Sequence, residues 1–365
     1  MALQTAGAPS RLERILALAP DDPAGLARAF EDSADWDALV HEAREHGLFT
    51  LLVHECDRAG GSVPATVRED YDRHHAIASV WHAHLLAALG VLGETFADAN
   101  QRVVALKGPL LGERVYPEGA LRPSVDLDLL VAENDLEPAV ATLERAGWET
   151  DSGPAAAYAR RHHHHLQLRR EGQPPLELHF RARVAFGTVM PAADLVARSS
   201  AVTLTHGRGL RILAPEDELV YLAVHATAHA FTRLMWLYDL KLLCCRYASE
   251  IDWRVVVERA RSVRMLTAVA FACEMLRERL NVAVPDLPEL RPHGLRYRLA
   301  QHVQQRVARH EGVLALDRAG GLAFTSLLCD RPLAAARVWG HHASHMLKRC
   351  VQRRLPRLVP ADWAG

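Results

Sequence analysis

The sequence VVALKGPLLGERVYPEGALRPSVDLDLLVA, residues 103–132, determines the fold expected for this chain. It opens with a short run of apolar, mostly β-branched residues, which predicts a buried strand. Lys107-Gly108 ends that run, and Pro109 is typical of the first turn of a helix, where its missing N–H costs no hydrogen bond. We therefore expect a strand, a turn and a helix, followed by a second strand over residues 126–131.

Two aspartates lie on the second predicted strand. Because side chains alternate along a strand, Asp126 and Asp128 share one face, and the intervening leucines share the other. Neighbouring carboxylates repel each other and lose hydration when they are buried, so a divalent cation between them is the usual remedy. A solvated edge strand is the alternative. The nearby Arg122 and Ser124 favour a site, because they add ligand-binding groups to the same short segment.

A third carboxylate comes from a predicted hairpin further along the chain. Residues 163–170 and 176–181 predict two strands joined by a turn rich in glycine and proline. In a small mixed sheet this hairpin places Glu177 beside the aspartate strand. Alternation puts His179 on the same face as Glu177.

The order strand, Lys-Gly turn, helix and then Arg-Pro-Ser-Val-Asp-Leu-Asp-Leu-Leu-Val resembles the polymerase-β-type nucleotidyltransferase superfamily. Within it, the bacterial "nucleotidyltransferase family protein" group is the closest match, and toxins of the abortive-infection type share the Arg-x-Ser-x-Asp-x-Asp pattern. The resemblance is specific over residues 103–132 and weaker over 176–180 and 215–243. The chain departs at the turn, where many members have Gly-Ser or Gly-Gly and this one has Lys107-Gly108.

The resemblance implies an enzyme that transfers a nucleoside monophosphate from a nucleoside triphosphate, with AMP from ATP as the first choice. The acceptor would be a hydroxyl or phosphate of a small molecule or peptide. Two Mg²⁺ ions, or Mn²⁺ in their place, would clamp the in-line displacement. Asp126 and Asp128 would bridge both ions, and Glu177 would hold the one that activates the acceptor.

The residues expected to bind the nucleotide gather around the same segment. Only three of the 43 basic residues are lysines, and one of them, Lys107, lies in the candidate turn, where a compact ammonium suits a phosphate. Gly108 lets a phosphate approach the backbone. The full expected set is Lys107, Gly108, Arg122, Ser124, His179, His229 and Arg233.

The last two members of that set belong to a strongly apolar helix predicted over residues 215–243. Its polar positions are His225, His229, Arg233 and Trp236, at four- and three-residue steps. One interpretation is a pair of core histidines. The other is a wall of the nucleotide cleft in which Arg233 reaches a phosphate, and the resemblance favours it.

Two other functions stay open. A toxin-like enzyme that adds nucleotides to tRNA is disfavoured by the net charge of −1, although a basic helix predicted over 331–359 keeps it under consideration. A catalytically inactive nucleotide-binding module is disfavoured by the three carboxylates, Asp126, Asp128 and Glu177, since an inactive protein has no need to keep repelling charges together.

The predicted organisation is an α+β fold: a small mixed β-sheet with helices on one face, between two helical regions. The expected units are a helical region over 1–100, a nucleotidyltransferase core over 101–205 and a helical domain over 206–365. We expect no segment apolar enough to span a membrane and no secretion signal, hence a cytoplasmic protein.

Four consecutive histidines, residues 162–165, lie in the middle of the chain. On a strand, alternate rings face opposite ways, so all four cannot bind one ion. We expect a strand at the rim of the site with one or two usable imidazoles. A zinc site would need a third ligand from elsewhere in the chain.

Overall fold

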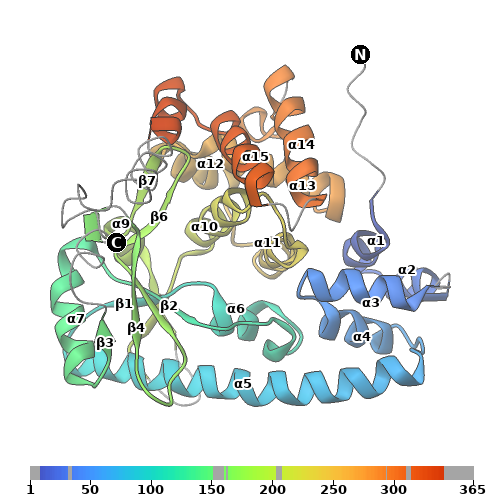
Figure 1. Ribbon diagram of the computed structural model, residues 1–365, viewed down its shortest axis with the longest axis horizontal. Coiled ribbons are helices and arrows are strands. Elements are labelled where there is room, and N and C mark those ends of the chain that lie inside the picture. Colours follow the sequence, from blue (N-terminus) through green and yellow to red (C-terminus); the bar gives the residue numbers. More distant parts are fainter. Residues whose placement is uncertain are drawn as a thin grey trace, which may run out of the picture.

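The computed structural model describes residues 9–31, 35–150, 160–161, 163–202, 208–292, 294–309 and 314–340. A mixed sheet lies at one end of the molecule, and helices surround it (Figure 1). Its strand order is β3-β4-β5-β2-β1-β9-β8. The strands of this sheet are β1 (Val103–Ala105), β2 (Leu127–Leu130), β3 (Glu149–Thr150), β4 (His165–Arg169), β5 (Leu176–His179), β8 (Ser200–Ala201) and β9 (Leu210–Ile212). A separate ribbon pairs β6 (Arg181–Ala185) with β7 (Thr188–Pro191).

The centre of the sheet confirms the two predicted strands and the predicted hairpin. β1 is antiparallel to β2, β2 is parallel to β5, and β5 is antiparallel to β4. Glu177 lies beside the aspartate strand, as the sequence predicted, and the β2–β5 register places it directly opposite Asp128. The two-stranded ribbon β6–β7 and the strands β9 and β8, which extend the sheet beyond β1, were not predicted, because these segments show no clear alternation of apolar and polar residues.

The two faces of the sheet are buried in different ways. Leu127, Leu129 and Val131 pack in one hydrophobic core with residues of α5 (Ala65–Asp98) and α7 (Leu136–Arg145). The opposite face carries Asp128, whose neighbour Leu130 belongs to a second core formed largely by the other helices. The predicted alternation is therefore confirmed, and so is the α+β class with flanking helical regions.

The N-terminal helices form a group at the far end of α5 from the sheet (Figure 1). They belong to the N-terminal helical region that the sequence predicted. This group consists of α1 (Arg11–Leu18), α2 (Pro23–Glu31), α3 (Trp36–Glu45) and α4 (Phe49–Arg58).

The expectation that no segment is apolar enough to span a membrane was wrong for α5 by length and composition. Its most apolar window of 18 residues has a mean hydropathy of 1.6, and 39% of that window is buried in the fold. Leu85, Leu89 and Phe96 of this helix pack against the sheet. The buried side chains of α5 thus contribute to the core of the protein, whereas Ile77, Val80 and Val91 are exposed.

In the view of Figure 1 the helices α10 to α15 lie above the sheet and α5, and α6 lies beside the sheet, above α5. Short 3-10 turns, η1 (Gly119–Leu121), η2 (Glu133–Asp135) and η3 (Pro288–Leu290), join some of the elements. The helices are α6 (Gly108–Val115), α9 (Ala193–Arg198), α10 (Pro215–Ala228), α11 (Leu234–Arg246), α12 (Trp253–Ser262), α13 (Leu266–Leu280), α14 (Gly294–Arg309) and α15 (Leu314–Leu327). Of the predicted C-terminal helix over 331–359, residues 332–340 are helical, and its basic part lies outside the described residues.

The single helix predicted over 215–243 is in fact two helices, α10 and α11. Ala230 and Phe231 adopt positive φ angles of 50° and 53°, and the Phe231 amide donates to the Ala226 carbonyl at 3.0 Å. Residues in the left-handed conformation, with a hydrogen bond from their amide to a carbonyl of the preceding turn, end a helix. Periodicity could not reveal this break, because Phe231 is itself buried and continues the apolar pattern.

Candidate active site

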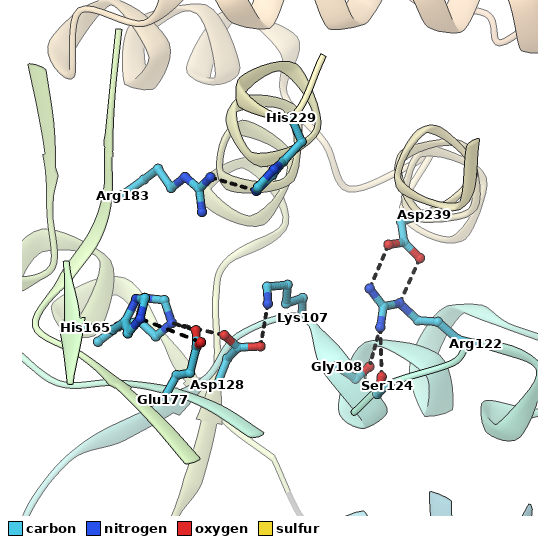
Figure 2. Close-up of polar contacts among 11 residues, drawn as sticks. Lys107, Gly108, Arg122, Ser124, Asp128, His165, Glu177, Arg183, His229 and Asp239 are labelled. Carbon is cyan, nitrogen blue, oxygen red and sulfur yellow. Dashed lines mark hydrogen bonds and ion pairs between the residues drawn. The ribbon is translucent and has the colours of Figure 1, made fainter. Parts of the chain in front are cut away.

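Asp128 is the centre of the candidate site. Its carboxylate is buried and accepts two hydrogen bonds, from Lys107 Nζ at 2.6 Å and from His179 Nε2 at 3.0 Å (Figure 2). Lys107 lies in the turn after β1, and His179 ends β5, the strand on the other side of β2. Three adjacent strands of the sheet therefore supply one polar cluster.

The electrostatics of Asp128 are those of an ion pair. Burial by itself would raise the pKa of the Asp128 carboxyl, but the charge of Lys107 and the hydrogen bond from His179 outweigh burial and hold that pKa well below its usual range. Burial would likewise lower the pKa of Lys107, yet the nearby Asp128 raises it. Both groups are therefore charged at neutral pH.

Glu177 and Asp126 complete an acidic cluster around Asp128. The hydrogen bond from His179, whose Nε2 lies 3.4 Å from Glu177 Oε2, lowers the pKa of Glu177. Asp126, half-buried just before β2, has its pKa raised by burial and by the negative charges of Asp128 and Glu177. Among the three carboxyl groups, only Asp126 thus has a raised pKa, which is the effect expected of repulsion between carboxylates.

The donor set around Asp128 fits a hard divalent cation. Asp128, Glu177 and His179 each offer a ligand atom within 4.8 Å of the other two. Asp126 does not belong to this tightest group but stands beside it. Carboxylate oxygens are the ligands that Mg²⁺ prefers, and a cation would relieve the charge repulsion that raises the pKa of Asp126.

The turn at Lys107-Gly108 has the local geometry of an anion site. Gly108 has a φ of +73°, a conformation that favours glycine. α6 begins at this residue without a hydrogen bond from a capping side chain, and Pro109 lies in its first turn as predicted. The amides at the start of α6 and the helix dipole therefore favour a negatively charged ligand here.

Arg122 holds this turn in place through a network of hydrogen bonds. Its Nε and Nη2 each donate to the carboxylate of Asp239 at 2.8 Å, and its Nη1 donates to the Gly108 carbonyl at 3.3 Å and to Ser124 Oγ at 3.0 Å (Figure 2). Tyr116 also donates to Asp239, at 2.8 Å. Arg122 and Ser124 were expected to bind nucleotide. In the structure both belong to this network, because a buried guanidinium requires partners, and their contact with a nucleotide stays a prediction.

Arg183 and His229 face the acidic cluster from the opposite side (Figure 2). Arg183 Nη2 donates to His229 Nε2 at 2.8 Å. Burial and the charge of Arg183 lower the pKa of His229 to about 4, so its ring is neutral and can accept that bond. The Arg183 Nε is buried without a hydrogen-bond partner, and Arg183 forms no ion pair within the described part of the chain.

The break between α10 and α11 changes the predicted polar face of this segment. His225, His229 and Trp236 still meet, with ring centroids 4.8 to 5.4 Å apart. Arg233 is exposed and is the N-terminal cap residue of α11, where its charge helps to lower the pKa of His229. Its predicted contact with a phosphate stays a prediction.

Sequence reasoning missed Arg183. The signal was present, because Glu177, His179, Arg181 and Arg183 occur at every second position. The strand is interrupted at Phe180, and Arg181 pairs with Glu133 outside the site. Arg183 alone continues the line of polar side chains into the site.

A comparison with family models supports the resemblance seen in the sequence. The model described as "Uncharacterised nucleotidyltransferase" matches residues 32–281, which is more than half of the chain. The matched range contains β1, α6, β2 and β5 with all the residues of the acidic cluster. Neither the curated proteins nor the solved structures gave a match.

The raised pKa of Asp126 predicts a pH-dependent stability effect. In the folded protein the ionised carboxylate is disfavoured, so without divalent cations Asp126→Asn should raise the melting temperature at pH 7. The difference should vanish as pH falls below about 4, where the carboxyl is neutral in the unfolded chain as well. Thermal unfolding across pH measures this, with the exposed Glu94→Gln as the control. A lower melting temperature for Asp126→Asn at pH 7 would contradict the charge cluster.

The Arg122–Asp239 network predicts a large loss of stability when one partner is removed. Arg122→Met should lower the free energy of unfolding by about 3–5 kcal/mol, because Asp239 is left buried and unpaired. The double variant Arg122→Met/Asp239→Leu should recover part of this loss. Arg208→Met, which breaks an exposed pair with Asp98, should cost less than about 1 kcal/mol. Chemical denaturation measures the free energy of unfolding of each variant. Equal losses in Arg122→Met and Arg208→Met would refute a structural role for Arg122.

Proposed function

Because the chain belongs to the uncharacterised nucleotidyltransferase family, we propose that it transfers a nucleoside monophosphate, AMP from ATP, to a hydroxyl or phosphate of a small-molecule or peptide acceptor. The observation that carries the proposal is the buried Asp128 beside Glu177, with Lys107 on one side and Arg183 facing both. Carboxylates for cations and basic groups for phosphates are the two requirements of this chemistry.

The acidic cluster is the proposed cation site. Asp126, Asp128 and Glu177 would hold Mg²⁺, and His179 keeps Asp128 and Glu177 oriented through its Nε2. When bound, the cations neutralise charge on the attacking and leaving oxygens of the displacement. Asp128 has two oxygens with two lone pairs each, so it can bind a cation while it continues to accept hydrogen bonds.

The basic groups around the cluster are the proposed triphosphate site. Lys107 has two candidate acceptors: Asp128 Oδ2 in the free protein, and a phosphate oxygen in the complex. The uncapped start of α6 adds amides beside it. From the opposite side Arg183, with its unpartnered Nε, would bind a phosphate, and the exposed Arg233 would extend the same positive surface.

The proposed reaction balances as a single displacement. An acceptor oxygen forms a bond to the α-phosphorus of ATP, the bond from that phosphorus to the bridging oxygen breaks, and pyrophosphate leaves. The acceptor proton passes to a neighbouring base, for which the carboxylates of the acidic cluster are the nearest candidates. Arg122 acts only indirectly, by fixing the Gly108 turn through its hydrogen bond to the Gly108 carbonyl.

Turnover tests the proposed reaction. Purified protein is incubated with Mg²⁺ and ATP labelled at the α- or γ-phosphate, together with a metabolite extract or, in a parallel arm, with tRNA. We expect α-label in a new product, release of γ-label as pyrophosphate, and loss of both in Asp128→Asn, because this variant removes a charge on which the cations depend. Label on tRNA alone would favour the toxin-like function. Unchanged turnover in Asp128→Asn would refute the assignment of the site.

Nucleotide affinity tests the role of Arg183 separately. Arg183→Gln should weaken the binding of a non-hydrolysable ATP analogue by about 1.5–3 kcal/mol, the usual value of a hydrogen bond to a charged group. Arg181→Gln is the matched control, since Arg181 lies two residues away and pairs with Glu133. Calorimetric titration compares the two variants with wild type. Equal affinities for all three would remove Arg183 from the proposed triphosphate site.

A further inference from the structure

Three histidine rings converge beside the acidic cluster. His165 on β4 lies opposite His179 on β5, and their ring centroids are 5.1 Å apart. His164 precedes β4 in a bend, so strand alternation does not force its ring to the other face. Its centroid lies 4.7 Å from that of His165 and 5.3 Å from that of His179. One ligand nitrogen from each ring lies within 4.8 Å of the other two.

His179 is the third ligand that a zinc site at the histidine run would require. No local sequence pattern indicates this ligand, because residues 164 and 179 are brought together only by the pairing of β4 with β5. The expected alternation of rings applies to residues within a strand, and His164 lies outside it. The strand begins one residue later, at His165.

Two of these rings have a buried nitrogen without a partner. His179 is 2% exposed, and its Nε2 is engaged by Asp128 and Glu177, whereas its Nδ1 has no hydrogen-bond partner within the described residues. His165 repeats the pattern: its Nε2 lies 3.6 Å from Glu177 Oε1, and its buried Nδ1 likewise has no partner there. Such unsatisfied polar atoms are costly, so a ligand for them is expected.

The pairing of each ring with a carboxylate is the arrangement found around metal-bound histidines. A histidine that binds a metal through one nitrogen usually donates its other N–H to a carboxylate, which fixes the orientation of the ring. Asp128 occupies that supporting position for His179 through a hydrogen bond, and Glu177 lies 3.6 Å from His165 Nε2, on the same side of its ring. The carboxylates of the proposed Mg²⁺ site would therefore also orient the ligands of a second ion.

We propose that His164, His165 and His179 bind one Zn²⁺, through Nδ1 in the case of His165 and His179. Imidazole nitrogens suit Zn²⁺, whereas Mg²⁺ prefers oxygen, so the two adjacent sites select different metals. Three protein ligands leave a fourth position for water or a phosphate oxygen, as in catalytic zinc sites. Tetrahedral binding needs nitrogens about 3.3 Å apart, for Zn–N bonds of about 2.0–2.1 Å, and His164 at the half-buried rim can close that distance.

This site does not rest on the proposed nucleotidyl transfer. It uses ring nitrogens that the acidic cluster leaves free, and the carboxylates support the rings whether or not a nucleotide binds. A Zn²⁺ ion there would add positive charge next to Glu177 and Asp128. Absence of Zn²⁺ binding and absence of nucleotidyl transfer can be observed separately, because metal binding is measured without ATP.

Calorimetric titration of ZnSO₄ into chelator-treated protein, purified without a histidine tag, tests the proposal. We expect one Zn²⁺ per chain, and Co²⁺ in its place should give the visible absorption of a four-coordinate site. His164→Ala should lower Zn²⁺ affinity by more than about tenfold, the least that the loss of even a supporting partner usually costs. His163→Ala is the matched control, since it removes the exposed imidazole one position earlier and should leave the affinity unchanged.

Two results would overturn the proposal. One is unchanged Zn²⁺ affinity in His164→Ala. The other is Zn²⁺ binding that Asp126→Asn abolishes and His164→Ala preserves, because the ion would then belong to the acidic cluster. Circular dichroism accompanies each titration, and His164→Gln replaces His164→Ala should the latter lose its fold.

Discussion

The fold around the site depends on one buried charge, the carboxylate of Asp128. A carboxylate that loses its water costs several kcal/mol unless it gains a partner of opposite charge and hydrogen bonds. Lys107 supplies the charge from the turn after β1, and His179 supplies a hydrogen bond from the end of β5. Because β2 lies between β5 and β1, each of its two neighbouring strands brings one partner to Asp128.

Two further buried ion pairs fix the helices over this sheet. Arg122 joins the turn at Gly108 to Asp239 of α11, and Arg114 of α6 pairs with Glu218 of α10. α6 is thus anchored to both helices that follow the sheet. This anchoring holds His229 and the ribbon residue Arg183 opposite the acidic cluster, which is the geometry that the proposed transfer reaction requires.

The parts of the site that were predictable are those with short-range patterns. Alternation predicted the shared face of Asp126 and Asp128, because this follows from a period of two within one strand. The hairpin between two short strands placed Glu177 beside that strand. The partner of Arg122 lies 117 residues away, so no local pattern could reveal it. The scarcity of lysine pointed to Lys107, but Lys241 has a structural role: it donates to the carbonyls of Leu16 and Ala17 at the end of α1.

The crystal structure of the protein with Mn²⁺ and a non-hydrolysable ATP analogue tests the central claim most directly, because anomalous scattering locates the cation. Nucleotidyl transfer at this site predicts Mn²⁺ between Asp128 and Glu177, with Asp126 turned toward it, and a triphosphate that contacts Lys107 and Arg183. Mn²⁺ elsewhere, or a triphosphate bound away from the start of α6, would contradict it.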